Sequence, residues 1–271
     1  MAVALQDGTK VWRRRAPGVQ LAVWAAWLVA AAAFVACGQL ISDKTIWAFV
    51  TDAPTQAADL AVRMVPPDWG FMRVLWRPLW DTINIATLGT LLAVVLAIPI
   101  AYCAARNTTP SAALVRPVAL FIIVSSRSIN SLIWALMLVT VVGPGVLAGI
   151  LAIGLRSIGF CAKLLYEAIE EIDERQVEAV RATGASRAQV TAYGIVPQVL
   201  PAFAGISVFR WDINIRESTV LGLVGAGGIG LPLNAALTSL AWTQVSLILL
   251  IIIATVVVSE WVSAKVRHAI I

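Results

Sequence analysis

The sequence predicts an all-α integral membrane protein with six membrane-spanning helices in one transmembrane domain. Apolar residues make up 60% of the 271-residue chain, and charged residues only 13%, against about 25% in soluble domains. The mean hydropathy is +0.87. Six separate apolar runs each have about the 20 residues that a spanning helix needs. The net charge of +5 does not indicate nucleic-acid binding, because the basic residues mostly flank these runs.

The apolar runs divide the chain into a short tail and a transmembrane domain. Residues 1–18 are expected to form a cytoplasmic N-terminal tail, and residues 19–271 the transmembrane domain. A polar stretch rich in aspartate and proline follows the first span, and a charged segment at residues 166–198 follows the fourth. The predicted spans cover residues 19–41, 83–105, 115–142, 146–165, 199–221 and 243–264.

The first apolar run has two features that also occur in export signals. Arginines at positions 13–15 precede it, and Cys37 follows Phe34-Val35-Ala36 in a weak lipoprotein-like match. We favour a retained first span, because the run is longer than a typical signal core and more spans follow. The three cysteines lie in or beside apolar runs without metal-ligand spacing, so we assign them no disulfide and no metal.

Charged and polar residues interrupt the third, fourth and fifth spans. A charged side chain at the bilayer centre costs about 2.5–3.5 kcal/mol, so such residues usually face a cavity or a partner. One interpretation is internal pairing, above all of Arg210 or Arg216 with Asp212 or Glu217. The other is a path for anions. The candidate path residues are Arg127, Ser128 and Asn130 in the third span, Arg156 in the fourth, and Arg210, Asp212, Arg216 and Glu217 in the fifth.

Arg127 and Arg156 have no acidic residue in their own predicted spans. They are therefore the better candidates for contact with an anion, or for hydrogen bonds to backbone carbonyls. A guanidinium can bind a tetrahedral oxyanion through two parallel hydrogen bonds. Affinity along a route must stay low enough for release, so we expect these arginines to set a favourable potential rather than a tight site.

The charged segment at 166–198 has the pattern of a membrane-surface helix. Its glutamates follow helical spacing, and apolar residues occupy the opposite face. We expect Gly184 to end this helix and Ser186 to cap a second short helix that runs towards Pro197. A solvated loop is the alternative that the pattern alone leaves open. The glutamates are Glu167, Glu170, Glu171, Glu174 and Glu178, and the apolar residues are Ile169, Ile172, Ala179 and Val180.

Four glycines lie in the six-residue stretch GAGGIG between the fifth and sixth spans. The spacing of Gly225, Gly227 and Gly230 matches a dinucleotide-binding fingerprint, but the stretch follows a predicted membrane helix instead of a strand. No acidic residue follows within about 20 residues to bind a ribose. We therefore expect Gly225, Gly227, Gly228 and Gly230 to permit close packing or a helix break, at a gate or a dimer contact.

The distribution of basic residues predicts the orientation of the chain. Six spans place both termini on one side, which is expected to be cytoplasmic together with segment 166–198. The twelve basic residues of that side are Lys10, Arg13, Arg14, Arg15, Arg106, Arg116, Lys163, Arg175, Arg181, Arg187, Lys265 and Arg267, and the four on the opposite side are Lys44, Arg63, Arg73 and Arg77.

The sequence contains no recognisable catalytic constellation. It has no Gly-x4-Gly-Lys-Ser/Thr run, so the chain is not expected to hydrolyse ATP itself. Its one histidine, His268, has no plausible nucleophile and acid to form a triad. We assign no catalytic residue, no metal site and no cofactor.

Within the charged segment, Glu178, Ala179, Gly184 and Pro197 resemble the EAA loop of ABC-importer permeases. That pattern reads Glu-Ala-Ala, three residues, Gly, nine residues, Ile, one residue, Leu-Pro. This chain departs from it at three positions, Val180, Gly194 and Val196. The resemblance implies coupling helices that sit in a groove of an ATP-hydrolysing subunit, and the implied contact residues are Glu178, Ala179, Gly184, Ala185 and Pro197.

Shorter matches over residues 60–265 resemble permeases of phosphonate importers. They include Pro66-Pro67-Asp68-Trp69, Leu79 to Ile83, Leu88-Gly89-Thr90, Ile98-Pro99, Ala-Ala-Arg-Asn at 104–107 and Arg216 to Gly222. The resemblance implies a path for phosphonate, or for phosphate or phosphite. A permease for methionine or another small organic solute, an ion-gradient-driven carrier and, more weakly, a membrane enzyme remain the alternatives.

The same resemblance implies a fold, a location and partners. The fold is that of type I importers of the methionine type, in the bacterial inner membrane. Two copies or two paralogues are expected to pair within the lipid and form one path. Two ATP-binding cassette subunits would dock on the coupling helices, and an extracytoplasmic binding protein would deliver the substrate.

Overall fold

The computed structural model describes residues 2–6, 9–13 and 17–270, which form two compact units. The first unit extends to Leu60 and the second from Ala61 to Ile271. Arg14 and Arg15, two of the basic residues used to predict orientation, lie outside the described residues.

The first unit contains the apolar helix predicted from sequence, together with a two-stranded hairpin and most of a second helix, neither of which was predicted. Strands β1 (Ala2–Gln6) and β2 (Thr9–Arg13) pair as an antiparallel hairpin in the region expected to be a plain tail. Helix α1 (Pro17–Lys44) contains the first predicted span. Helix α2 (Trp47–Met64), which continues into the second unit, occupies most of the stretch described from sequence as polar and proline-rich, and Pro54 lies inside it.

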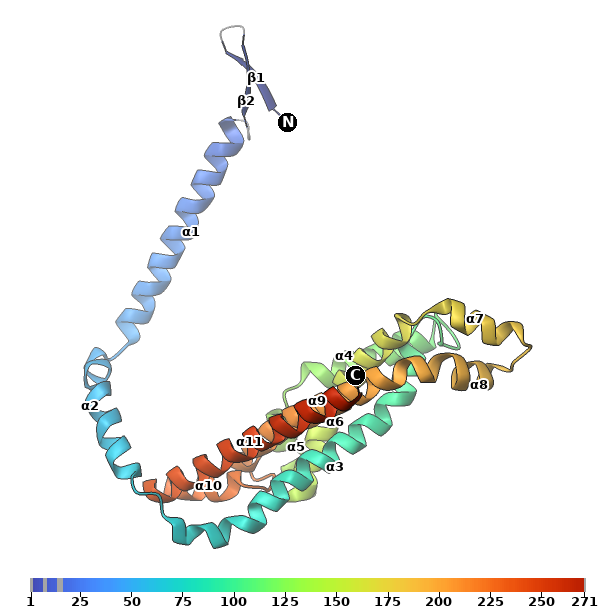
Figure 1. Cartoon of the computed structure of the whole chain (residues 1–271). Helices are drawn as coiled ribbons and strands as arrows, with labels where there is room; N and C mark the ends of the chain where they lie inside the picture. Colours follow the sequence, from blue (N-terminus) through green and yellow to red (C-terminus); the bar gives the residue numbers. More distant parts are fainter. Residues whose placement is uncertain (1, 7–8, 14–16, 271) are drawn as a thin grey trace. The chain divides into compact units, whose positions relative to one another are not determined.

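In the second unit, long helices run side by side and carry the remaining predicted spans (Figure 1). After the short helix η1 (Trp69–Phe71) come α3 (Met72–Ala104), α6 (Val146–Glu170), α9 (Val196–Leu221) and α11 (Trp242–Ile270). With α1, five helices among the described residues are long and apolar enough to cross a membrane. The six-span prediction therefore depends on the third span.

The third predicted span, residues 115–142, is wrong as a single helix. It consists of α4 (Val115–Ser128) and α5 (Ser131–Val142), which meet at an angle of 89°. Ile129 and Asn130 adopt extended backbone angles, and the Asn130 side chain accepts a hydrogen bond from the backbone N–H of Leu132, so it caps the second helix. The broken pair makes the sixth span when counted as one.

Helix α6 is the centre of the second unit and packs against α3, α4, α5 and α9. Small residues allow the backbones to approach closely, as is common between membrane helices. A Cβ on Gly159 would lie 2.5 Å from the Ile123 carbonyl oxygen of α4, and one on Gly89 of α3 would lie 2.8 Å from Ile153. These contacts fix the positions of α3 and α4 against α6.

The two ends of the second unit carry different connections. At the end we call the coupling end, α7 (Glu174–Ala182), α8 (Arg187–Val190) and the π-helical turn η2 (Thr191–Ile195) link α6 to α9 (Figure 1). At the opposite end, the glycine end, η3 (Gly222–Val224) and α10 (Gly230–Thr238) link α9 to α11.

Candidate functional site

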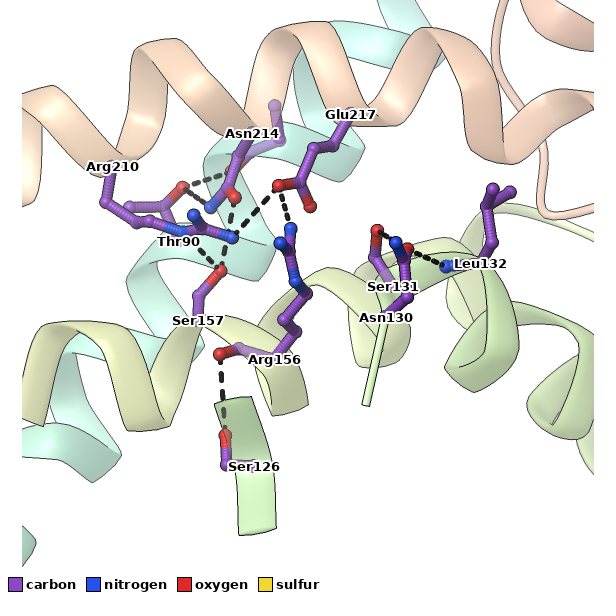
Figure 2. Close-up of polar contacts among 11 residues, drawn as sticks. Thr90, Ser126, Asn130, Ser131, Leu132, Arg156, Ser157, Arg210, Asn214 and Glu217 are labelled. Atoms are coloured by element: carbon purple, nitrogen blue, oxygen red, sulfur yellow. Dashed lines mark hydrogen bonds and ion pairs between the residues drawn. The ribbon is translucent and has the colours of Figure 1, made fainter. Parts of the chain in front are cut away.

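Three charged side chains meet between α6 and α9, in the middle of the second unit. Arg156 of α6 and Arg210 of α9 both donate to the same carboxylate oxygen, Oε1 of Glu217 (Figure 2). The Arg210 Nη2 to Glu217 Oε1 distance is 3.4 Å. The second oxygen, Oε2, is buried and has no hydrogen-bond partner among the residues that the structure describes. One carboxylate thus neutralises part of the charge of two guanidiniums.

Arg210 is held rigidly by further contacts. Its Nε donates to Ser157 Oγ at 2.9 Å, and its guanidinium lies 5.0 Å from the centroid of the Phe160 ring. Ser157 Oγ donates to Asn214 Oδ1, and Asn214 Nδ2 donates to Thr90 Oγ1 at 2.7 Å, which ties α6, α9 and α3 together (Figure 2). The side chain of Arg210 is 3% exposed. No sequence pattern singled out Ser157, Asn214 and Thr90 as members of this network.

A cavity of 330 Å³ opens beside this cluster. Arg127 of α4 lines it and is exposed, and its side chain makes no ion pair or hydrogen bond with any described residue. Ser128 and Asn130 are also exposed but do not line the cavity, and Asn130 instead caps α5. The cavity is lined by Arg127, Arg156, Phe160, Arg210, Ile213 and Glu217.

The second acid of α9 pairs separately. Asp212 Oδ2 accepts from Arg216 Nη2, one helical turn further along α9, and Asp212 Oδ1 accepts from Ser259 Oγ of α11 at 2.8 Å. Asp212 is buried, whereas the Arg216 side chain is about half exposed, at 48%. Neither residue lines the cavity. This pair therefore joins α9 to α11 beside the Arg156–Arg210–Glu217 cluster.

These contacts refine the two interpretations drawn from sequence. Arg216 pairs with Asp212, and Arg210 with Glu217, as the internal-pairing interpretation required. Arg156 has no acid within its predicted span but is paired across helices, with Glu217 of α9. Spacing within one helix could not reveal a pair that forms between helices. Arg127 is the arginine of this region without such a partner among the described residues.

A second candidate site lies at the coupling end. Gly184 follows α7 with φ of +79°, and Ser186 and Gln189 form a reciprocal capping box at the start of α8. Glu178 and Ala179 are exposed on α7, Ala185 is half-buried in the turn, and Pro197 lies in the first turn of α9. The sequence thus located the turn and both caps of this segment.

The single acidic face expected over residues 167–178 is wrong. Helix α6 ends at Glu170, and Asp173 starts α7 with its side chain accepting from the backbone N–H of Arg175. Glu170 belongs to α6 and lies 3.7 Å from Arg116, at the start of α4. The glutamates are therefore divided between α6, α7 and the turn that holds Glu171, because the N-cap at Asp173 competes with continuation of the helix.

The short helix α7 packs closely against the turn that follows it. Gly194 of η2 is buried, and a Cβ added to it would lie 3.4 Å from the Cα of Val177. The glycine at this position, a departure from the EAA pattern, therefore leaves room for α7, and the helix continues through η2 directly into α9.

The glycine stretch forms a tightly packed loop at the glycine end. Gly225, Gly227 and Gly228 have φ of +89°, +85° and +77°, angles that other residues rarely adopt. The backbone N–H of Ile229 donates to Thr82 Oγ1 of α3 at 2.8 Å, and the N–H of Gly145 donates to the Gly225 carbonyl at 3.0 Å. The loop therefore joins α3 to the turn between α5 and α6.

Comparison with known families identifies a match over most of the second unit. The family described as "Binding-protein-dependent transport system inner membrane component" matches residues 93–268. The phosphite transport system permease protein PtxC of Stutzerimonas stutzeri is 44% identical over 210 residues, which are 78% of this chain and 76% of that protein. The phosphate-import permease protein PhnE of Mycolicibacterium smegmatis is 38% identical over 231 residues, 83% of this chain and 43% of that protein.

Solved structures agree on the fold. A chain of the MetNI methionine ABC transporter in an inward-facing conformation superposes with a TM-score of 0.66 and 21% identity, covering 75% of this chain and 99% of that one. A chain of a bacterial alginate ABC transporter in complex with a periplasmic protein superposes with a TM-score of 0.54 and 16% identity, covering 89% of this chain and 98% of that one.

Proposed function

Because the chain belongs to the family of binding-protein-dependent transport system inner membrane components, we propose that it forms the membrane path of an ATP-driven importer for a phosphorus oxyanion. Phosphonate, phosphate and phosphite are the candidate substrates. The observation that carries this proposal is the cationic cavity among α4, α6 and α9. Guanidiniums bind such tetrahedral anions through paired hydrogen bonds. The names of the phosphite and phosphate relatives support the same class.

The motor of this importer is a separate protein. The chain has no phosphate-binding loop, so two ATP-binding cassette subunits supply hydrolysis and dock on α7 and α8. A binding protein delivers the substrate at the glycine end, and a second copy or a paralogue completes the path. The coupling end and both termini face the cytoplasm, in agreement with the excess of basic residues.

Structure at the coupling end suggests how motor movement reaches the membrane. Helix α8 continues through η2 into α9 without a break, and α9 carries Arg210 and Glu217. Helix α7 packs on η2 through Gly194 and Val177. A displacement of α7 and α8 when the ATPase subunits close would therefore act on the helix that lines the cavity, which opens alternately to each side.

Removal of the coupling contacts tests the motor assignment. Glu178→Ala removes an exposed charge of α7, and Gly184→Leu places a branched side chain at a φ of +79°, which costs roughly 1–2 kcal/mol. We expect both changes to abolish co-purification of the ATP-binding subunit while the chain still inserts in the membrane. Gln176→Ala, two residues away and also exposed, is the matched control. Failure of the unchanged chain to bind any ATPase subunit would refute the assignment.

Uptake by the reconstituted importer tests the substrate class. Vesicles containing the chain, its ATPase and its binding protein should accumulate phosphite, phosphate or methylphosphonate only with ATP inside. Accumulation of methionine instead would favour the alternative of an organic solute. Accumulation without ATP that stops when the ion gradient is collapsed would identify a gradient-driven carrier.

A further inference from the structure

The cavity beside Glu217 carries more positive than negative charge. Of the residues that line it, Arg127, Arg156 and Arg210 are cationic and Glu217 is anionic, which leaves a formal charge of +2. A single water requires about 10–15 Å³ of such space, so the 330 Å³ cavity has room for a small hydrated anion. An anion with two negative charges would make the cavity neutral.

The three arginines differ in how firmly they are held. Arg210 is 3% exposed and is fixed by Ser157, Phe160 and Glu217. The Arg156 side chain is 30% exposed, and Glu217 Oε1 is the one side-chain partner of its guanidinium among the described residues. Arg127 has none among them. Arg156 and Arg127 can therefore turn to an incoming anion, whereas Arg210 stays with Glu217.

Glu217 is placed to compete with that anion. Both arginines donate to the same oxygen, Oε1, whereas Oε2 is buried without a hydrogen-bond partner in the described part of the chain (Figure 2). The carboxylate is therefore incompletely bonded there. A carboxylate beside an anion repels it, and it also occupies the donors that the anion needs. Conduction requires affinity that is weak enough for release.

We propose that this cavity is a transient site for a doubly charged tetrahedral oxyanion, and that Glu217 is its built-in competitor. This inference rests on the proposed function. The anion replaces Glu217 Oε1 as the partner of Arg156 and is also bound by Arg127, while the ion pair between Arg210 and Glu217 remains. When the anion moves on, Glu217 recovers Arg156. The binding protein selects the substrate, and the cavity recognises charge and shape alone.

Equilibrium binding of labelled inorganic phosphate to the purified permease–ATPase complex, without binding protein, tests this site. Glu217→Gln keeps the size of the side chain and removes the competing charge, so it should tighten phosphate binding by roughly tenfold or more. Arg156→Gln should weaken binding by roughly tenfold. Sulfate should compete in both the unchanged chain and Glu217→Gln. At saturating substrate, Glu217→Gln should transport more slowly, because release is impeded.

The expected changes in phosphate affinity have opposite signs in Glu217→Gln and Arg156→Gln. Loss of folding would instead weaken phosphate binding in both variants, so the two explanations can be distinguished. Glu260→Gln, on the exposed surface of α11 and away from the cavity, is the matched control and should bind phosphate as the unchanged chain does. Weaker or equal binding by an assembled Glu217→Gln complex would overturn the inference. The proposed function would survive that result if the unchanged importer still accumulates a phosphorus oxyanion with ATP, and would fall if it does not.

Discussion

At the scale of single residues, the sharing of Glu217 explains how the arginines are tolerated among spanning helices. The attraction within a buried ion pair offsets the free energy of desolvation only when the geometry is good and further hydrogen bonds are made. Arg210 has both, because Ser157 and Asn214 extend its bonds to α3. Arg156 has one side-chain partner among the described residues, Glu217, and Arg127 has none. Charged residues within membrane spans usually face a cavity and mark a substrate or ion pathway.

Arg127 provides the sharpest test at this scale. Arg127→Leu removes a cavity charge without breaking a side-chain ion pair or hydrogen bond to a described residue. We therefore expect substrate uptake to fall at least tenfold while the complex with the ATPase still assembles. Uptake by vesicles and co-purification of the ATPase measure the two quantities on one preparation. Normal uptake by this variant would exclude a role for Arg127 in the path.

At the scale of elements, the prediction from sequence was correct for helices that hydropathy determines. It failed where the capping of a new helix by a single side chain sets the helix boundary. The predicted spans at 199–221 and 243–264 lie within α9 and α11. A long apolar run in a membrane forms a helix, because only there are its backbone hydrogen bonds satisfied within the segment. The breaks at Asn130 and Asp173 escaped prediction, because a single side chain that caps a new helix outweighs helical periodicity. Helix α2 was missed because its composition resembles a polar loop.

Some residues of the candidate site could likewise be predicted from sequence, and others could not. Motif and charge singled out Arg127, Arg156, Arg210 and Glu217, because charges are rare in apolar runs. The pairing of Arg156 with Glu217 depends on how α6 and α9 lie together, which no spacing within one helix encodes. Uncharged members of the network, such as Ser157, carry no distinguishing signal in sequence.

The glycine stretch is an element whose role can be tested directly. Gly228→Leu would place Cβ 2.8 Å from Thr82 Oγ1 at a φ of +77°, and Gly227→Leu would meet the backbone of Val146 at 3.0 Å. We expect each to lower stability by about 1–3 kcal/mol and to impair transport, with unchanged nucleotide affinity of the ATPase. Gly205→Leu is the control, because a Cβ there has open space. Normal thermal unfolding and transport by both loop variants would contradict this role.

At the scale of the whole molecule, the two ends of the second unit differ in the elements that meet there. Asp68 and Thr243 are joined by a backbone hydrogen bond at the glycine end, whereas Arg116 and Glu170 lie together at the coupling end. We propose that the coupling end faces the cytoplasm, because the resemblance of its loop to the EAA pattern implies contact with the motor there. The excess of basic residues predicts the same orientation.

Labelling of introduced cysteines measures that orientation. After replacement of Cys37, Cys103 and Cys161 by alanine, Ser239→Cys lies exposed beside α10 and Ala269→Cys lies exposed near the end of α11. If the glycine end faces outward, as we propose, a membrane-impermeant maleimide should label Ser239→Cys in intact spheroplasts and Ala269→Cys only after permeabilisation. The reverse pattern would invert the orientation, and with it the side at which a binding protein delivers substrate. Labelling of both in intact spheroplasts would mean that α11 does not cross the membrane.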